Sequence, residues 1–210
     1  MSTPSQANVS FALLDRAVVT GRADEPVLTG WSHARLLEEV AALGGVLHHL
    51  GVAVGVGVPI DLEAEADAVV AALAVARLGG VVHAGHGPGE AGAQVGPVVV
   101  ASAGSPWVAG AAQPGVVRLV RHAGPRTAPG APGGGRARVP IPDPSPGPSP
   151  EQDLAWDAMI RAGRTDPAAC TLVDAAAAYA PGRSVAEVLA DLQASPPPYA
   201  AGELRRILGV

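Results

Sequence analysis

The chain has 210 residues, of which 21 are proline and 27 are glycine, and hydrophobic residues make up 48% while aromatic residues make up 3%. This length allows one domain or slightly more, with a core built from Ala, Val and Leu rather than from aromatic rings. The formal net charge is −5 and all 14 basic side chains are arginine, which excludes a Schiff-base lysine, a P-loop lysine and lysine-dependent adenylation for this sequence.

The first half of the sequence alternates between helical and strand patterns. Between residues 32 and 50 apolar side chains recur at helical spacing, Ser32 is suited to cap the helix, and Gly51 follows at the position of a left-handed cap. Helices are expected over 9–19, 32–50 and 63–78, and strands over 56–62, 81–83, 98–100 and 116–120. A strand, a helix and a second strand with a Gly-rich return favour a parallel, buried sheet.

The second half begins with a segment of different composition. Fifteen of the 27 residues in 124–150 are Pro or Gly, which predicts a disordered linker that cannot pack into a core. Further helices are expected over 153–162, 184–192 and 202–208, with Ser184 as a cap and Glu187 at the third helical position. The sequence as a whole predicts the α/β class, with a short, mainly parallel sheet flanked by helices.

Positive charge is concentrated in the middle of the chain. Residues 91–142 carry five arginines and no acid, a balance that is compatible with contact to nucleic acid or anionic lipid. No aromatic or amphipathic pattern accompanies these arginines, which favours a solvated linker instead. We therefore expect no nucleic-acid partner.

The uncharged stretch 91–117 is not expected to cross a membrane, because three prolines interrupt it and Gly and Ala outnumber Leu and Ile. Asp15 and Arg16 interrupt the early apolar run, which argues against a signal peptide. Cys170 is the single cysteine and cannot form an internal disulfide. Together these features predict a cytoplasmic protein without a membrane partner.

A glycine- and histidine-rich stretch supplies two candidate ligand sites. The run Gly85–Gly89 follows a strand and resembles a phosphate loop, but the prolines and glycines after it leave no helix to hold a phosphate, and Glu90 adds negative charge. A plain turn is the favoured interpretation. His83 and His86 with Glu90 form an incomplete metal-ligand set, and they are interpreted as turn or surface residues.

The remaining candidates carry no recognisable chemistry. His48 and His49 are adjacent on a helix and therefore point to different faces. Cys170 lies in no pattern that suggests a thiolate nucleophile, and its default role is that of a small buried residue. The sequence contains no Gly-x-Ser-x-Gly elbow, no Cys-x-x-Cys pair and no Walker loop. We therefore assign no catalytic, cofactor-binding or metal-binding residue from the sequence.

Four runs, taken in order, resemble landmarks of the AMP-forming acyl-CoA synthetases. Residues 32–52 resemble the first helix of that family, and residues 68–81 resemble its "EA-x-x-A-x-LA-x-x-R-x-GA-V" segment. Residues 14–16, Leu-Asp-Arg, resemble the "LDRH" of the acetyl- and propionyl-CoA synthetase branch. Residues 153–157, Asp-Leu-Ala-Trp-Asp, resemble the "L-x-W" stretch of the same branch. The resemblance covers residues 8–179.

This resemblance implies the front part of the large N-terminal domain of an adenylate-forming enzyme, an α/β layer of sheet and helices. It divides the sequence into a truncated synthetase-like domain over 8–123, a Pro/Gly-rich linker over 124–150 and a helical tail over 151–210. Within the tail, residues 153–179 still resemble the family. Its members would use ATP, Mg²⁺ and CoA.

The sequence departs from the family pattern at several of the family's motifs, including its phosphate loop. The acid of the family's "GD-x-V" turn is missing at Gly55–Val58, and Asp61–Glu63 replaces its "YMP"-type segment. After Tyr179 the chain reads Ala-Pro-Gly-Arg-Ser where the Ser/Thr/Gly-rich phosphate loop of the family would follow. No residue of this chain therefore inherits a catalytic role, and no cofactor is expected.

Three hypotheses about function follow. The first is a truncated, diverged acetyl/propionyl-CoA synthetase-like protein without ligase activity of its own, because the phosphate loop and the catalytic lysine are missing. The second is a non-catalytic binding or regulatory module that pairs with a full-length synthetase or another polypeptide through an exposed apolar face. The third is a degraded gene product that folds poorly.

Overall fold

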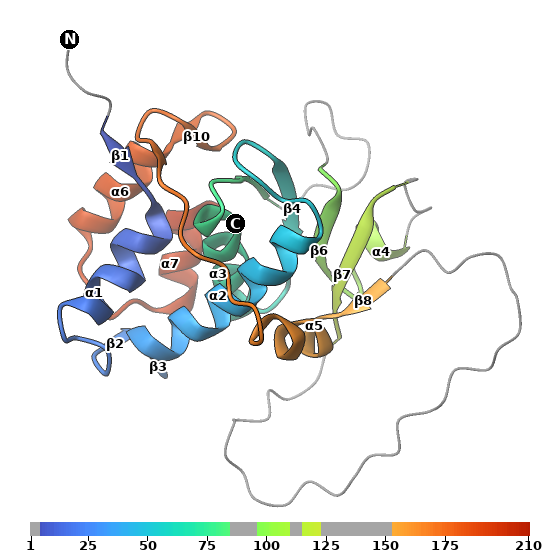
Figure 1. The fold of residues 1–210 in the computed structure, drawn as a ribbon, viewed down its shortest axis with the longest axis horizontal. Coiled ribbons are helices and arrows are strands. Elements are labelled where there is room, and N and C mark those ends of the chain that lie inside the picture. Colours follow the sequence, from blue (N-terminus) through green and yellow to red (C-terminus); the bar gives the residue numbers. More distant parts are fainter. Residues whose placement is uncertain (1–4, 85–95, 110–114, 123–152) are drawn as a thin grey trace, which may run out of the picture.

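The computed structural model describes residues 5–84, 96–109, 115–122 and 153–210, and these residues are built around a five-stranded parallel sheet (Figure 1). The strand order is β5-β4-β6-β7-β8, and every neighbouring pair is parallel. The strands are β4 (Gly57–Asp61), β5 (Val81–Ala84), β6 (Val98–Ser102), β7 (Val117–Arg121) and β8 (Asp153–Ala155). The predicted α/β class with a mainly parallel sheet is confirmed.

Most of the helices lie on one side of this sheet. Figure 1 shows α2 and α3 beside the strands, with α1, α6 and α7 on the far side of these two helices. The helical segments are η1 (Phe11–Asp15), α1 (Arg16–Val19), α2 (His33–His49), α3 (Glu65–Arg77), α4 (Pro106–Ala109), α5 (Trp156–Gly163), α6 (Val185–Ala194) and α7 (Ala201–Leu208). The short strands pair as β1 (Gln6–Ala7) with β9 (Val173–Asp174), β2 (Pro26–Leu28) with β3 (Trp31–Ser32), and β10 (Ala178–Ala180) with β11 (Arg183–Ser184).

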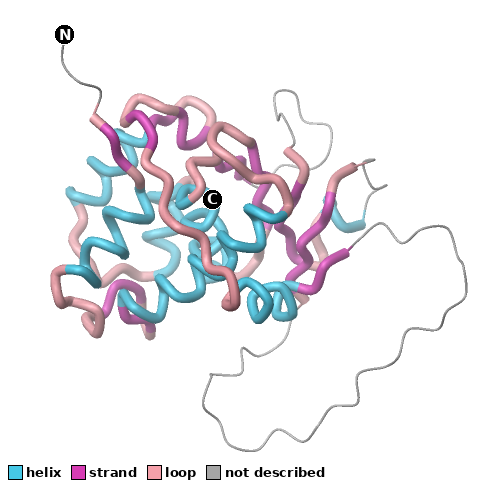
Figure 2. Tube along the Cα trace, in the orientation of Figure 1, coloured by secondary structure: helices cyan, strands magenta, loops and turns pink. Residues whose placement is uncertain are grey.

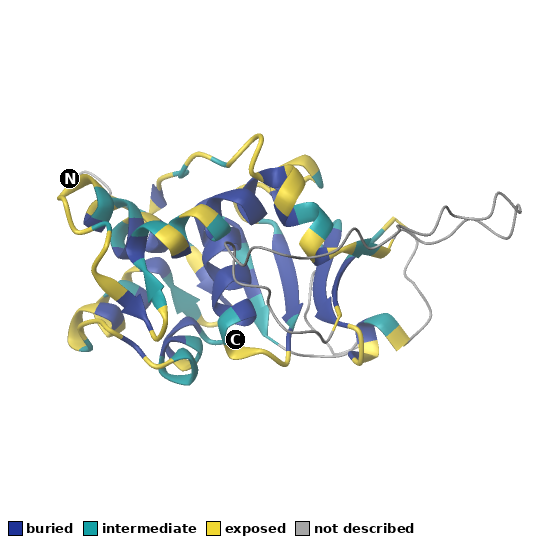
Figure 3. Ribbon diagram, turned by 90° about the horizontal axis from the view of Figure 1, so that it is seen from below, coloured by how far each residue is buried: buried dark blue, intermediate teal, exposed yellow. Residues whose placement is uncertain are grey.

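Helix α3 is the most deeply buried helix of the described structure. Every residue from Asp67 to Arg77 is buried. A helix that is apolar on all sides is stable only when other elements surround it, and here α2, α7, β4 and β5 all pack against it. Figure 3 shows the buried residues gathered in this layer and in the neighbouring strands. The Ala- and Val-rich composition of the chain is thus concentrated in a central helix.

The opposite face of the sheet has a small core of its own. Val98 and Val100 of β6 belong to the main core, whereas Val99 and Ala101 pack with Trp107 of α4. Because side chains alternate across a strand, β6 is buried on both of its faces. A continuous apolar strand of this kind is typical of a parallel sheet covered on both sides.

Two of the predicted helix caps are present. The Ser32 hydroxyl accepts a hydrogen bond of 3.4 Å from the backbone N–H of Arg35 at the start of α2. At the start of α6, Ser184 and Glu187 form a complete capping box. Hydrogen bonds from the backbone and side chain of Ser184 lower the pKa of Glu187, since they favour the ionised carboxylate.

The helix expected from residue 153 begins later than predicted. Residues Asp153–Ala155 form strand β8, in which Leu154 pairs with Leu119 of β7, and α5 begins at Trp156. Nothing in the sequence of these three residues distinguishes them from the helix that follows. Their pairing partner lies more than 30 residues upstream, and this long-range contact fixes their extended conformation.

Two of the arginines assigned to a solvated linker are structural instead. Arg118 and Arg121 lie in β7, and their side chains are 11% and 10% exposed. Arg118 pairs with Asp153 at 2.6 Å, and the Nε atom of Arg121 lies 2.9 Å from the Asp67 carboxylate. The linker interpretation is therefore wrong for these two residues, because acids distant in the sequence neutralise them inside the fold.

Several sequence predictions fall outside the described residues. They concern the Pro/Gly-rich linker 124–150, the turn Gly85–Gly89, and the ligand candidates His86 and Glu90. His83 is described, and it lies in the edge strand β5.

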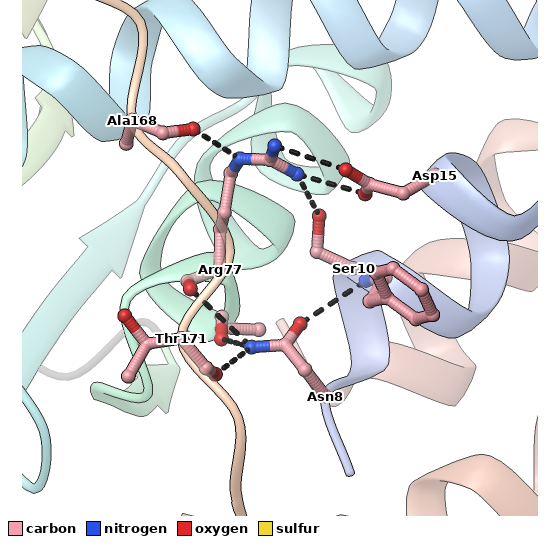
Figure 4. Close-up of polar contacts among 8 residues, drawn as sticks. Asn8, Ser10, Asp15, Arg77, Ala168 and Thr171 are labelled. Atoms are coloured by element: carbon pink, nitrogen blue, oxygen red, sulfur yellow. Dashed lines mark hydrogen bonds and ion pairs between the residues drawn. The ribbon is translucent and has the colours of Figure 1, made fainter. Parts of the chain in front are cut away.

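A segment after α5 crosses the helical layer and is held there by Arg77. Figure 2 shows it as a loop running from α5 past α2 to β9, and we call residues 164–172 the crossing segment. The guanidinium of Arg77 donates to the Ala168 carbonyl at 2.7 Å, and it forms two parallel hydrogen bonds to Asp15, at 2.8 and 3.0 Å (Figure 4). Arg77 thus joins α3, η1 and the crossing segment.

Asn8 completes this junction at the end of α3. Its side-chain amide donates to the backbone carbonyls of Ala76 and Thr171, both at 2.7 Å, and its carbonyl oxygen accepts from the backbone N–H of Phe11 at 3.1 Å (Figure 4). One buried side chain therefore provides hydrogen-bond partners for a backbone carbonyl in the last turn of α3 and for a backbone N–H in the first turn of the N-terminal helical segment.

Replacing Asp15 by Ala should cost about 3 kcal/mol of unfolding free energy, because Arg77 would keep a buried charge without its counter-ion. The matched control is Asp191→Ala. Asp191 also pairs with an arginine, Arg183, but is 57% exposed, so a loss of under about 1 kcal/mol is expected. Urea denaturation of both variants measures the difference. Equal losses would contradict a special role for the Arg77 junction.

Replacing Gly45 by Ala should also destabilise the fold, by about 2 kcal/mol, because the new methyl group would overlap the backbone carbonyl of Asp166 in the crossing segment. The control is Gly202→Ala in α7, where the new methyl group would meet only the end of the flexible Glu65 side chain. Because Ala favours a helix over Gly by about 1 kcal/mol, this control should be neutral or stabilising. Thermal or urea unfolding shows whether each variant has lost or gained stability, and a loss of similar size in both variants would contradict the prediction.

Candidate functional site

The carboxyl ends of β4 and β6 form the first candidate site. The chain leaves β4 toward β5 on one side and later returns to β6 on the other, so these two strands are the topological switch point of the sheet. Ligands of open α/β sheets bind outside the carboxyl ends of the strands at such a point. Here that edge presents Asp61 at the end of β4, Glu63 just after it, Ser102 at the end of β6 and Ser105 beyond it.

These four residues contact one another. The Ser105 hydroxyl donates to the Asp61 carboxylate at 2.5 Å, and the backbone N–H of Glu63 donates to the Ser102 hydroxyl at 2.9 Å. The two strand ends are therefore joined by their own polar groups. The carboxylates of Asp61 and Glu63 also make this edge acidic, which is unfavourable for an anionic phosphate.

The strand arginine at this edge of the sheet already has acidic partners. Arg121, at the end of β7, pairs with Asp67 at 2.9 Å and with Asp157 at 2.8 Å. Burial alone would lower the pKa of Arg121, but the hydrogen bonds and charges of the two aspartates raise it above its ordinary value. Its positive charge therefore neutralises the buried Asp67 and also pairs with the exposed Asp157.

A cavity of about 500 Å³ between the N-terminal helical segment and α6 is the second candidate site. Its walls come from β1 and η1, the first residue of α2, the crossing segment, α6 and the prolines after it. The lining residues are Gln6, Ala7, Asn8, Phe11, Ala12, Leu13, Arg16, Arg22, His33, Leu172, Leu189, Leu192, Gln193, Pro196, Pro197 and Tyr199. This size is within the range of small-molecule sites, which are about 300–1,000 Å³.

His33 is the buried ionisable group of this cavity. It is the first residue of α2, its exposure is 2%, and neither ring nitrogen has a hydrogen-bond partner of good geometry. Burial lowers the pKa of His33 below its usual value near 6.5, and the Arg22 charge acts in the same direction. The Leu13 backbone carbonyl and the Glu25 carboxylate oppose this shift without cancelling it. The ring is therefore neutral at pH 7.

A smaller cavity of about 290 Å³ lies between the end of α2 and α5. His49 lines it, with its Nδ1 atom 2.8 Å from the Gly45 carbonyl and its Nε2 atom 3.5 Å from the Asp166 carboxylate. The rings of His48 and His49 are edge-on, at an interplanar angle of 86°. His49 is well exposed, and the arrangement offers one weak ion pair at the surface.

Cys170 lies in the crossing segment and is half-buried. Burial raises the pKa of its thiol to about 11, so the thiol is protonated at neutral pH. In the portion of the chain that the structure describes, no three His, Cys, Asp or Glu residues converge as a metal site would need. No helix in the same portion is long and apolar enough to cross a bilayer.

The cavity and its histidine carry no clear signal in the sequence. His33 follows the cap Ser32 and has the position of a residue in an ordinary helix start. The cavity brings residue 11 close to residues 172 and 192, and local patterns carry no information about such contacts. A His at the first helical position of a chain with six histidines was the only available signal.

Comparisons with known proteins support the fold and go no further. No family model and no curated protein matches the sequence. Among solved structures, an acyl-CoA synthetase from Brucella canis is similar, with a TM-score of 0.58 and 17% identity. The anthranilate CoA ligase AuaEII in complex with anthranoyl-AMP is similar to the same degree, with a TM-score of 0.58 and 16% identity.

Both matches cover 85% of this chain but 32% of the ligase, so the chain spans about a third of the length of these enzymes. The expected correspondence with part of an adenylate-forming enzyme is therefore confirmed at the level of the fold. At this identity the likeness carries no information about activity or substrate.

The neutral His33 should make the fold less stable in acid. The unfolded chain holds this histidine at its ordinary pKa near 6.5 and the folded protein holds it lower, so protons bind the unfolded chain first as the pH falls. The stabilisation is thus present above pH 6.5 and is lost as the pH falls through the folded pKa. His33→Gln should show a smaller loss of unfolding free energy between pH 7 and 5 than the unaltered protein. Urea denaturation at both pH values measures these losses, and equal losses in the two proteins would contradict the prediction.

Proposed function

We propose that this 210-residue chain is a binding module with the acyl-CoA ligase fold that does not form acyl-adenylates by itself. The observation that carries the proposal is that the switch-point edge is acidic and that its polar groups already hydrogen-bond to one another. Asp61 and Glu63 make it acidic, and their hydrogen bonds with Ser105 and Ser102 join the two strand ends. Within the described residues, a nucleotide phosphate placed there would meet these two carboxylates, while the Arg205 guanidinium already donates to the Glu63 backbone carbonyl at 3.4 Å.

The electrostatic demand of adenylation supports the same conclusion. The reaction gathers negative charge on the α-phosphate, which cations and preorganised N–H donors must stabilise. The chain has no lysine, and the arginine at the end of β7, Arg121, is committed to Asp67 and Asp157. Releasing Arg121 for a phosphate would take this counter-ion away from the buried Asp67, at a cost of several kcal/mol.

We further propose that the chain is related to the acetyl- and propionyl-CoA synthetase branch. The supporting residues are Asp15 in the run 14–16 and Arg77 in the run 68–81, because these two landmarks meet in a bidentate ion pair. The run 153–157 contributes β8 and Asp157, which pairs with Arg121. Three of the four runs that carry the resemblance thus supply partners for ion pairs between distant parts of the fold.

ATP–pyrophosphate exchange tests the proposal directly. The purified chain is incubated with Mg²⁺-ATP, labelled pyrophosphate and, in turn, acetate, propionate or anthranilate. We expect no exchange above a blank without protein, while an intact acyl-CoA ligase in the same assay gives turnover. A cooperative thermal transition of the same preparation shows that the chain is folded. Exchange above the blank with any of the three acids would overturn the proposal.

A further inference from the structure

The 500 Å³ cavity has walls from three separate parts of the chain. Phe11 and Leu13 come from η1, which is a π-helical segment, a rare geometry that occurs frequently at functional sites. Leu172 comes from the crossing segment, and Leu189 and Leu192 come from α6. Because the fold has to bring these segments together, the cavity is a property of the tertiary structure and not of one loop.

Exposed apolar side chains gather at this cavity. Among the described residues, four large hydrophobic side chains are exposed: Phe11 at 40%, Val19 at 77%, Val54 at 58% and Leu172 at 49%. Two of the four, Phe11 and Leu172, line the cavity. Apolar surface that stays in contact with water around a concavity marks a place where an apolar ligand gains free energy by displacing that water.

His33, one of the polar side chains in the cavity wall, has no hydrogen-bond partner of good geometry for either ring nitrogen among the described residues. Buried polar atoms are hydrogen-bonded in the great majority of cases, so each exception needs a reason. Of the buried side chains in the described ranges whose polar atoms lack a partner, His33 lines this cavity, whereas Trp107 and Tyr179 line neither of the two cavities. A ligand head group lying against the His33 ring would supply the missing hydrogen bond.

The charge of the lining is positive, although the chain as a whole carries −5. Arg16 and Arg22 line the cavity, and no Asp or Glu is among the described residues of its lining. The Arg16 guanidinium is exposed and makes no ion pair within the described residues. Arg22 makes a long ion pair of 3.8 Å with Glu25 and donates a hydrogen bond of 3.4 Å to the Thr20 hydroxyl, and the Arg22 and Glu25 side chains are about half exposed. An anion at the mouth of the cavity would therefore meet cations that are available.

We propose that this cavity binds a small amphipathic anion, with an apolar body against Phe11 and the leucines and a single anionic head group near Arg16, Arg22 and His33. Carboxylates and sulfates on an aliphatic or aromatic body share this chemistry. The proposal does not depend on the absence of ligase activity, because the cavity lies apart from the switch-point edge and its ligand needs no nucleotide.

Calorimetric titration of the whole chain at pH 7 tests the ligand class with four probes of the same chain length. These are octanoate, octyl sulfate, octan-1-ol and octyltrimethylammonium. We expect the better of the two anions to bind about tenfold more tightly than octan-1-ol, and the cation to bind more weakly than the alcohol. The order of the two anions identifies the preferred head group. Equal affinity for octan-1-ol and both anions would overturn the proposal.

Three variants test the location of the site. Arg16→Gln should weaken binding of the preferred anion about fivefold and leave octan-1-ol unchanged, because it removes a charge and keeps the apolar walls. Arg161→Gln makes the same change on α5, away from the lining, and should alter neither affinity. Ala12→Phe places a ring inside the cavity and should abolish binding of both probes.

A spectroscopic signal links binding to His33. In the unaltered protein, addition of the preferred anion should shift the imidazole C–H proton resonances of His33 more than those of the exposed His48. An anion affinity that falls as much in Arg161→Gln as in Arg16→Gln would overturn the assignment. So would undiminished binding to Ala12→Phe, or a His33 signal that does not move.

Discussion

The burial of α3 is the constraint on which the rest of the structure depends. This helix is enclosed from Asp67 to Arg77, and it carries an ionisable side chain at each end of the enclosed stretch. A buried charge without a partner costs several kcal/mol. The charges of Asp67 and Arg77 must therefore be neutralised by side chains from elsewhere in the chain, and the fold supplies a partner for each.

The two ion pairs join different parts of the fold. At the carboxyl end of α3, Arg77 binds Asp15 of η1 and the carbonyl of Ala168 in the crossing segment. At the amino end, Asp67 binds Arg121 of β7, which also binds Asp157 of α5. The first junction holds the N-terminal segment on the helical layer, and the second holds the helical layer on the sheet. The crossing segment and η1 are also walls of the large cavity, so the same junction that neutralises Arg77 shapes that cavity.

The sequence was sufficient where a pattern is local. The stripe over 32–50 predicted α2 and its cap at Ser32, and the alternation of strands and helices predicted the parallel sheet. It was insufficient where a residue's environment is set by a distant partner. Asp153 lies in a strand because β7 is beside it, and Arg121 is buried because Asp67 neutralises it. Neither fact has a local signature, since a lone aspartate or arginine is usually on the surface.

The two candidate sites differ in whether the fold satisfies its own polar groups. At the switch point, Ser105 and Ser102 hydrogen-bond to Asp61 and to the backbone of Glu63, so a ligand would have to break contacts before making its own. In the large cavity, the ring nitrogens of His33 have no such partner. A ligand there displaces water from apolar walls and gains a polar partner in His33, and only the weak contacts of Arg22 to Glu25 and Thr20 compete with it. The same physical rule that argues against a nucleotide at the edge of the sheet therefore favours binding in the cavity.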